Sequence, residues 1–512
     1  MAKIATVKIL DEINIAIIGL TVTEYDVFYN MFGYYDNGYN FKPQYKLGVW
    51  DGKVRLFTKA GKTSINFIEE IIPILRDFGY KIRLIDKRSP LTFDVPLITN
   101  EQFEKECGIV LGDHQTNSVN ALLENCGGIT VVGTGGGKSY ILGAVFRQLH
   151  DSMGFRCLAI VPSTDLVLQT AAEIELFKND VGKYFGGEKN LNKTHVVSTW
   201  QSLQNNPEIL GMFDAIIVDE CHGAKSNVLK NMLMTYGKSA KFIAGVTGTL
   251  PKHIGDLRQV NYVLGYPQIT VASKELMDLG WLAKMRLKMV KLQEDFSAKW
   301  EQWKISNPEE AKDHTYKSFK EDYFPDFTAE RAWIKTNKDR NKFLAYIIES
   351  ETRSKGNSFV LVNGVDFGKR LAKLIPNSIF VYGADDSKVR KEIYDQFKIH
   401  DDVVVIATFN LASTGLNIKR IFNLFLIDPG KSFIQIIQSI GRGLRKAEDK
   451  DKVYVWDIAS DTKYSKRHMA QRKKYYKEQS YKYSEDSIAY HELVDSLIVG
   501  EPLDNPHEIV VY

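Results

Sequence analysis

The chain has 512 residues, four cysteines, a formal net charge of +4, and hydrophobic and charged fractions of 44% and 25%. Length and composition together predict about three globular domains and exclude a disordered or fibrous chain. No apolar run approaches the about 18 residues that span a bilayer, and the cysteines lack the C-x-x-C spacing of a zinc site, which indicates reduced thiols.

Residues 1–95 predict a small α+β domain. Strand signals at 6–10, 13–17 and 53–58 accompany a helical stretch at 23–32. Between positions 34 and 62, basic side chains that could contact phosphates alternate with aromatic rings that could stack on bases. A small core with solvated lysines explains the pattern equally well. The candidate nucleic-acid contacts are Lys42, Lys46, Trp50, Lys53 and Arg55.

Residues 101–283 alternate short apolar strands with helices, which predicts a parallel sheet covered on both faces. The strands are expected at 129–132, 157–161, 195–199, 215–218 and 242–246. The first is followed by the glycine-rich sequence GTGGGKS, which ends at Lys138 and Ser139. Glycines let backbone N–H groups face a polyphosphate, the lysine supplies a cation and the serine can bind Mg²⁺. Val132 stands where the strict pattern has glycine.

Polar residues also follow the other strands of this region. In parallel sheets ligands bind at the carboxyl ends of strands, so we expect these residues to gather at one edge. Asp219 and Glu220 follow the fourth strand. Asp219 can hold Mg²⁺ through water while Glu220 orients and deprotonates the attacking water.

Residues 284–340 break the alternation and are expected to be a connector or insertion. Residues 341–460 then repeat it, with strands at 359–362, 379–382, 403–407, 424–427 and 453–456. A predicted helix at 432–446 places Gln435, Gln438, Arg442 and Arg445 on one face. Its arginines could stabilise charge on a nucleotide held by the first lobe. For either arginine alone, a solvated basic helix is the alternative.

Residues 461–512 form a C-terminal segment that starts basic and aromatic. A nucleic-acid contact and a solvated tail helix are equally compatible with this composition.

These motifs, in this order, resemble those of superfamily 2 helicases and translocases over roughly residues 110–450. His114-Gln115 resembles the adenine-recognising glutamine motif, 134–139 motif I, 162–169 motif Ia and Asp219-Glu220-Cys221-His222 motif II. Thr247-Gly248-Thr249 stands where the family has Ser-Ala-Thr. In the second lobe, Thr408 with residues 414–417 is similar to motif V, and residues 438–445 are similar to motif VI.

The resemblance implies roles for individual residues. Catalytic roles fall on Lys138, Asp219, Glu220, Arg442 and Arg445, with Ser139 and Asp219 on the metal. Nucleotide contacts fall on Gln115, Thr134, Gly135, Gly136, Gly137, Lys138, Ser139, Gly415 and Asn417. A role in coupling ATP hydrolysis to movement is implied for His222, Thr247, Thr249 and Gln438. Nucleic-acid contacts fall on Pro162, Ser163, Thr164, Thr199, Trp200, Thr408 and Thr414.

The stretch NGYNFKPQYKLGVWDGKVRLF is similar to the N-terminal domain of recombination and repair helicases of tailed phages. The resemblance implies an α/β fold of two tandem RecA-like lobes with parallel sheets, preceded by the small α+β domain. It implies ATP and Mg²⁺ as cofactors, branched DNA and single-stranded/duplex junctions as partners together with the RNA of R-loops, and 3′ to 5′ movement. It also implies a monomer or weakly associating chain in the host cytoplasm without a membrane contact. Three alternatives remain: a duplex-DNA translocase that does not separate strands, an RNA helicase, and a nucleotide-gated clamp without turnover.

Overall fold

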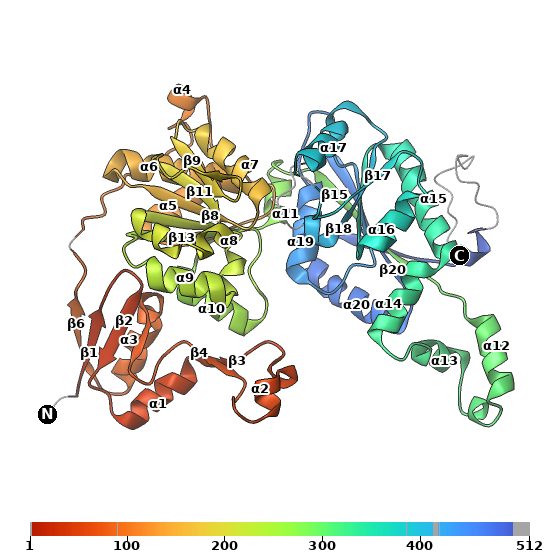
Figure 1. The fold of residues 1–512 in the computed structure, drawn as a ribbon, viewed down its shortest axis with the longest axis horizontal. Helices are drawn as coiled ribbons and strands as arrows, with labels where there is room; N and C mark the ends of the chain where they lie inside the picture. Colours follow the sequence, from red (N-terminus) through yellow and green to blue (C-terminus); the bar gives the residue numbers. More distant parts are fainter. Residues whose placement is uncertain (1–2, 90, 386, 413–417, 419, 495–512) are drawn as a thin grey trace. The chain divides into compact units, whose positions relative to one another are not determined.

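The computed structural model describes residues 3–89, 91–385, 387–412, 418 and 420–494. They form two compact units, Met1–Ala272 and Ser273–Tyr512. Figure 1 labels their helices and strands. Each unit has its own sheets and hydrophobic core, so each is described by itself.

The first unit begins with an α+β domain whose four-stranded sheet has the order β5-β2-β1-β6. Its elements are β1 (Ile4–Ile9), β2 (Asn14–Ile18), α1 (Val22–Met31), β5 (Lys62–Ser64), η2 (Ile65–Phe67), α3 (Ile68–Asp77) and β6 (Lys81–Asp86). Alternate residues of β1 point inward, and Phe28 of α1 and Leu75 of α3 pack in the same core. The predicted α+β domain is therefore confirmed.

A second, two-stranded ladder belongs to this domain. The strands β3 (Gly33–Tyr35) and β4 (Lys53–Arg55) pair antiparallel, and η1 (Tyr39–Phe41) and α2 (Pro43–Lys46) lie between them. We call residues 36–52 the β3–β4 loop. The strand predicted at 53–58 ends early, because Leu56 and Phe57 turn into the core.

The rest of the first unit is an eight-stranded sheet of order β10-β9-β11-β8-β12-β13-β7-β14, parallel except for the β10–β9 pair. Its strands are β7 (Gly127–Val132), β8 (Cys157–Val161), β9 (Val181–Phe185), β10 (Glu188–Lys189), β11 (His195–Thr199), β12 (Ala215–Asp219), β13 (Phe242–Thr247) and β14 (Pro267–Val271). Its helices are α4 (Glu104–Cys107), α5 (Asp113–Glu124), α6 (Lys138–Met153), α7 (Thr164–Glu175), α8 (Trp200–Gln204), η3 (Pro207–Met212), η4 (Cys221–Lys225), α9 (Asn227–Tyr236) and α10 (Ile254–Leu264). The five predicted strands are present, and their parallel direction brings their carboxyl ends to one edge.

The second unit contains a seven-stranded parallel sheet of order β17-β18-β16-β19-β20-β15-β21. Its strands are β15 (Lys284–Leu292), β16 (Ser358–Val362), β17 (Ser378–Val381), β18 (Val404–Thr408), β19 (Asn423–Ile427), β20 (Lys452–Ser460) and β21 (Tyr483–Ile488). Its helices are α11 (Ser273–Asp278), α12 (Ser297–Ser306), η5 (Glu310–Lys312), α13 (Tyr316–Asp322), α14 (Phe327–Thr336), α15 (Lys338–Lys355), α16 (Val365–Ala372), α17 (Ser387–Ile399), α18 (Phe409–Ala412), α19 (Phe433–Gly443), α20 (Lys463–Glu478) and η6 (Tyr490–Glu492).

Two segments differ from the sequence prediction. The strand β15 lies in the range read as a connector, yet it is hydrogen-bonded between β20 and β21. The range read as a nucleic-acid contact or solvated tail contains α20 and β21, which pack on the sheet. Arg472 of α20 is fully buried and forms an ion pair with Asp457 of β20 at 2.6 Å. The second lobe therefore extends at both ends beyond residues 341–460.

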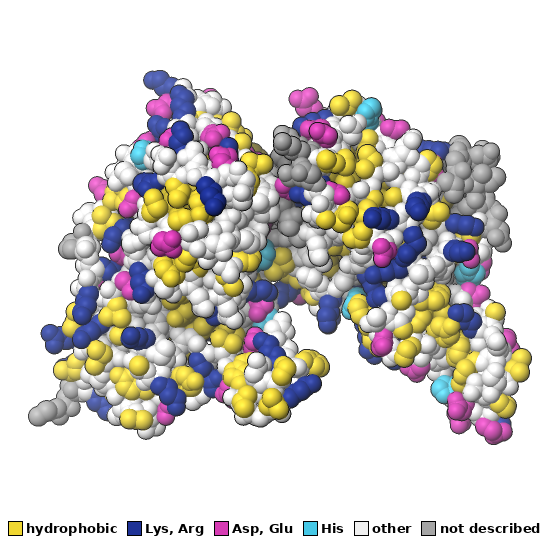
Figure 2. All heavy atoms as spheres, viewed as in Figure 1, with side chains coloured by type: hydrophobic (Ala, Val, Ile, Leu, Met, Phe, Trp, Pro, Cys, Tyr) yellow, Lys and Arg dark blue, Asp and Glu magenta, His cyan; other side chains and the backbone are white. Residues whose placement is uncertain are grey.

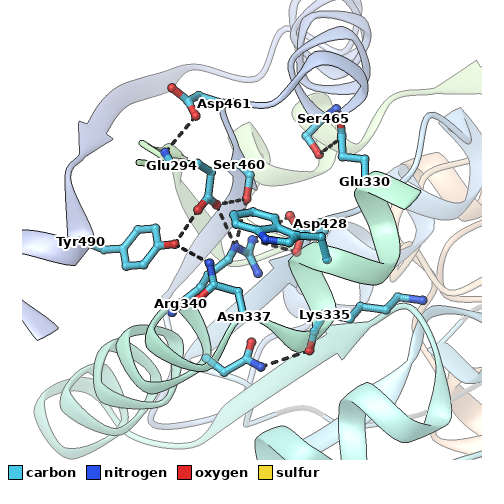
Figure 3. A network of polar contacts seen from close by, with 12 residues as sticks. Glu294, Glu330, Lys335, Asn337, Arg340, Asp428, Ser460, Asp461, Ser465 and Tyr490 are labelled. Carbon is cyan, nitrogen blue, oxygen red and sulfur yellow. Dashed lines mark hydrogen bonds and ion pairs between the residues drawn. The ribbon is translucent and has the colours of Figure 1, made fainter. Parts of the chain in front are cut away.

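The true insertion is the helical segment α12 to α14, which Figure 1 shows projecting from the second unit. It has its own aromatic cluster around Phe296, Phe319 and Phe324. Buried polar contacts hold α14, the last helix of the insertion, and α15, which follows it, as Figure 3 shows. Arg340 of α15 pairs with Asp428, which follows β19, at 2.7 Å, and Glu330 of α14 accepts hydrogen bonds from the amide and hydroxyl of Ser465 of α20 at 2.8 Å. Among the residues described, no helix has the length and apolarity needed to cross a bilayer.

Candidate functional site

The predicted phosphate loop connects β7 to α6, so the first amides of α6 border it. Gly135 and Gly137 have φ of +90° and +81°. A Cβ at Gly137 would lie 2.1 Å from Gln115 Nε2, so this position requires glycine. Gln115 Nε2 donates to the Gly136 carbonyl at 3.3 Å, and its Oε1 accepts from the Gly112 amide at 2.9 Å. The structure thus places the predicted adenine-recognising glutamine against the loop.

The catalytic candidates of the first unit meet at the carboxyl ends of β7 and β12. Lys138 Nζ lies 3.3 Å from Glu220 Oε1. Glu220 has a φ of +47°, a left-handed conformation that side chains seldom adopt and that is frequent at functional sites. The Asp219 carboxyl is buried, and burial together with the Glu220 charge raises its pKa. A cation beside the two carboxylates would offset this cost.

The predicted coupling residues form a contiguous group beside the carboxylates. The Thr247 hydroxyl lies 3.2 Å from Glu220 Oε2 and 3.1 Å from His222 Nδ1. A Cβ on Gly248 would lie 2.9 Å from Thr134 Oγ1 and 3.5 Å from Lys138 Nζ. The turn after β13 therefore packs directly against the phosphate loop.

The residues present suit a Mg²⁺-bound polyphosphate. Thr134 Oγ1 and Thr249 Oγ1 are buried and have no hydrogen-bond partner among the residues described. Buried hydroxyls are normally satisfied, so these two are available to a ligand. Ser139 lies in the first turn of α6. Within the described ranges no three His, Cys, Asp or Glu side chains group as metal ligands. Mg²⁺ needs few protein ligands because it keeps waters and substrate phosphates.

The predicted nucleic-acid contacts of motif Ia and of 199–200 lie side by side, because β8 and β11 are neighbours. Gln201 Nε2 donates to the Pro162 carbonyl at 3.4 Å. Ser163 and Thr199 are N-caps of α7 and α8. The hydroxyl of Thr199 is buried and accepts from the Ser202 amide at 3.2 Å. Thr164 is exposed, and Trp200 is half-buried.

In the N-terminal domain, several predicted DNA contacts are already used inside the β3–β4 loop and its base. Lys42 pairs with Asp36, and Arg55 pairs with Asp51. The indole N–H of Trp50 donates to the Lys53 carbonyl at 2.9 Å. Lys46 is exposed. These charged groups therefore hold the loop while Lys46 faces solvent, and contact of this stretch with nucleic acid stays a prediction.

In the second unit, Thr408 ends β18, whereas Thr414, Gly415 and Asn417 lie outside the described residues. The arginine helix α19 ends at Gly443 rather than at the predicted residue 446. Gln438 and Arg442 are buried, and Arg445 is half-buried just past the helix end.

Sequence reasoning missed Lys450, which stabilises the end of α19. Its buried ammonium donates to the carbonyls of Gly443 at 2.5 Å and Arg445 at 2.8 Å. Burial, and secondarily the Arg445 charge, lowers the pKa of Lys450 to about 7. No motif marks this residue, because its role depends on a loop that folds back on the helix.

The sequence also did not reveal how the N-terminal domain docks on the lobe that follows it. Arg258 of α10 pairs with Glu70 of α3 at 2.9 Å, and its guanidinium lies 5.0 Å from the Phe67 ring centre. Glu12 pairs with Lys241 and Arg88. A cavity of about 440 Å³ lies at this junction. Domain and lobe therefore form one unit.

Three family descriptions match successive parts of the chain. They are "DNA helicase UvsW, N-terminal" over residues 18–86, "Type III restriction enzyme, res subunit" over 108–252, and "Helicase conserved C-terminal domain" over 339–447. The chain thus combines a UvsW-type N-terminal domain with both parts of a helicase motor, as the resemblance implied.

Individual relatives agree with these matches. The ATP-dependent DNA helicase UvsW of Enterobacteria phage T4 is 25% identical over 468 residues, which cover 87% of this chain and 89% of that protein. A DNA 3′–5′ translocase of Sulfurisphaera tokodaii is 29% identical over 182 residues, or 35% of this chain and 40% of that protein. A DNA-bound type ISP restriction-modification enzyme shares the fold, with a TM-score of 0.53, 14% identity, and coverage of 84% of this chain and 37% of that enzyme.

Proposed function

We propose that this ATP-hydrolysing DNA helicase remodels branched DNA such as forks, Holliday junctions and R-loops, and moves 3′ to 5′ in recombination, repair and replication. The observation that carries the proposal is the docking of the UvsW-type domain on the ATP-binding lobe through Arg258 and Glu12. A DNA-holding domain fixed to a motor can keep one arm of a branch in place while the motor moves along another. The cytoplasm of a phage host is the compartment that the T4 relative suggests.

In the proposed reaction, Lys138 and the amides of the glycine loop bind the phosphates of ATP. Ser139 and Asp219 would hold Mg²⁺, which neutralises phosphate charge when bound. Glu220 accepts the proton of the attacking water, and Thr247, 3.2 Å from its Oε2, orients it. His222 and Thr247 link this carboxylate to the turn after β13, and this link would transmit a change at the nucleotide to that turn.

The proposed DNA path follows the edge formed by Pro162, Thr164 and Trp200. These groups, and backbone amides at the N-termini of α7 and α8, suit phosphates rather than base edges. We therefore propose recognition of DNA structure rather than sequence. Because such binding releases counterions, affinity should fall steeply as salt rises.

A duplex-DNA translocase that does not separate strands is the second candidate. The match to a restriction-enzyme subunit over 108–252 and the translocase relative favour it. The two functions differ in one product: a helicase releases single strands, whereas a tracking motor only displaces a bound third strand.

The test is ATP turnover with Mg²⁺, first without polymer and then with single-stranded DNA, duplex DNA, a synthetic fork and single-stranded RNA. We expect the fork to stimulate turnover most and to be separated in the same reaction. Displacement of a triplex-forming strand without fork separation would favour the tracking motor. Stimulation by RNA alone would refute the DNA substrate, and absence of turnover with every polymer would refute the enzyme.

A further inference from the structure

The β3–β4 loop exposes apolar side chains that the fold does not use. Phe41, Leu47 and Val49 are 75%, 76% and 74% exposed, and neither η1 nor α2 contains a buried residue. Figure 2 shows this hydrophobic group over α2, with Lys and Arg side chains beside it. Clustered exposed apolar side chains are costly in water and commonly mark an interaction site.

The loop is nevertheless held at its base by specific contacts. The Tyr35 and Tyr39 rings stack at 4.6 Å, and Tyr39 meets Tyr45 edge-on at 4.8 Å. Gly52 has a φ of +80°, and a Cβ there would lie 2.5 Å from the Tyr39 ring. The tip itself is hydrogen-bonded to α2, since the amides of Leu47 and Val49 donate to the carbonyls of Pro43 at 2.9 Å and Gln44 at 3.1 Å.

The loop also packs on the ATP-binding lobe. The Tyr34 ring of β3 lies against Gly255 of α10, where a Cβ would approach it to 2.2 Å. In turn, Asp256 of α10 pairs at 2.8 Å with Lys225 of η4, the helix that follows Glu220. The loop thus moves with the lobe whose carboxylates we assign to catalysis.

We propose that the apolar tip, Phe41, Leu47 and Val49, is the wedge that enters the branch point of DNA and unstacks the first base pair as the motor advances. This inference rests on the proposed function and adds a strand-separating element to it. Apolar side chains inserted at a base step unstack it, and aromatic rings stack on exposed bases. The charge of the surroundings selects nucleic acid as the occupant, since Lys46 and Lys53 flank the tip and the two acids nearby are neutralised by Lys42 and Arg55.

The test uses the full chain with the double substitution Leu47→Ser and Val49→Ser. Val22→Ser, an 80% exposed apolar residue on α1 of the same domain, is the matched control. We expect the double variant to separate a fork about tenfold more slowly while its DNA-stimulated ATP turnover stays within about twofold, because the tip contacts bases and not the nucleotide. The Val22→Ser protein should match the unsubstituted chain in both assays.

A second measurement follows the base itself. A fork with 2-aminopurine in the first base pair of the duplex should brighten when the unsubstituted protein binds without ATP, and the double variant should lose this rise. Phe41→Ala should lose it as well. An undiminished rise and undiminished fork separation in the double variant would overturn the wedge and assign the tip to a protein partner. A parallel loss of ATP turnover would overturn it in favour of a general defect.

The two proposals fail differently. If DNA does not stimulate turnover by the unsubstituted chain, the helicase proposal fails, whereas the 2-aminopurine signal still decides whether the tip unstacks a junction. If turnover and fork separation are normal in every variant, only the wedge fails.

Discussion

At the scale of single residues, Glu220 is the proposed general base; it has a left-handed backbone and lies 3.3 Å from Lys138 Nζ and 3.2 Å from the Thr247 hydroxyl. Glu220→Gln keeps the shape of the side chain but cannot accept the proton. We expect turnover to fall by at least about 100-fold while ATP binding persists, as measured by steady-state hydrolysis and by fluorescent-nucleotide titration.

The matched control for Glu220→Gln is Glu188→Gln, an exposed residue of β10 in the same sheet. It removes the same charge from the same lobe far from the loop in sequence, so turnover should not change. A Glu220→Gln protein that hydrolyses ATP at the normal rate would transfer the role of base to another residue.

Lys450 gives a prediction about pH. Its folded-state pKa is lowered to about 7, so between about pH 7 and the ordinary lysine pKa of about 10.5 the unfolded chain binds a proton that the folded chain does not. The free energy of unfolding therefore rises with pH across this window. Below about pH 7 the contribution of this group is at its lowest and no longer changes with pH. In denaturant unfolding, the increase in the free energy of unfolding from pH 7 to pH 9.5 should be about 1–3 kcal/mol larger for the unsubstituted protein than for Lys450→Met.

Lys446→Met serves as the control, because Lys446 is exposed beside the same helix end. It should retain the pH dependence of the unsubstituted chain. Identical pH dependence in Lys450→Met would mean that Lys450 stays charged when folded, held by the carbonyls of Gly443 and Arg445.

Residues with a motif could be located from the sequence, whereas their supporting partners could not. The contacts of Lys138 with Glu220 and of His222 with Thr247 follow from strand order, because parallel strands share an edge. Lys450 and Arg258 have no local signature. Arg258 meets Glu70 across 188 positions, so only the folded chain reveals the pair.

At the scale of elements, apolar runs gave accurate strands, and β8 and β11 have the predicted bounds. The strand β15 was missed although the first six residues of KMRLKMVKL alternate with a period of two, because the charged, aromatic and helical stretch that follows led the whole range 284–340 to be interpreted as a connector. The structure shows how a lysine is accommodated there: Lys288 lies 5.2 Å from the Trp456 ring centre and pairs with Asp486. For α20, composition could not reveal that Arg472 is buried against Asp457.

The docking of α3 on α10 yields a prediction for these elements. Arg258→Ala removes the ion pair with Glu70 and the guanidinium contact with the Phe67 ring, so the partly buried Glu70 carboxylate loses its cation and keeps the hydrogen bond from the Tyr266 hydroxyl. We expect the N-terminal domain to open more often, so limited proteolysis should cut residues 91–99, which form no helix or strand, about tenfold faster.

Arg76→Ala is the matched control, since Arg76 is exposed on the same helix α3. It should leave the cleavage rate unchanged. Equal protection of the Arg258→Ala protein would mean that the Glu12–Lys241 ion pair and the surrounding packing hold the domain without it.

At the scale of the whole molecule, the residues of the proposed reaction are divided between the two units. The phosphate loop and carboxylates belong to the first unit, whereas the arginines of motif VI belong to the second. Each unit has its own parallel sheet and core, so each can be a rigid body. An arginine supplied by one body to a nucleotide on another would make hydrolysis depend on their movement, which a motor requires.

Arg445→Ala tests this division. Arg445 lies past the end of α19 and is half-buried, so its loss should perturb the second unit little. Because an arginine acting on transition-state charge contributes mainly to turnover, we expect hydrolysis to fall by about 1,000-fold and nucleotide affinity by less than about threefold. Lys446→Ala, the exposed neighbour, should leave both unchanged. An equal loss of affinity and turnover would mean that Arg445 binds the ground state, and normal turnover would mean that the first unit carries the chemistry without this arginine.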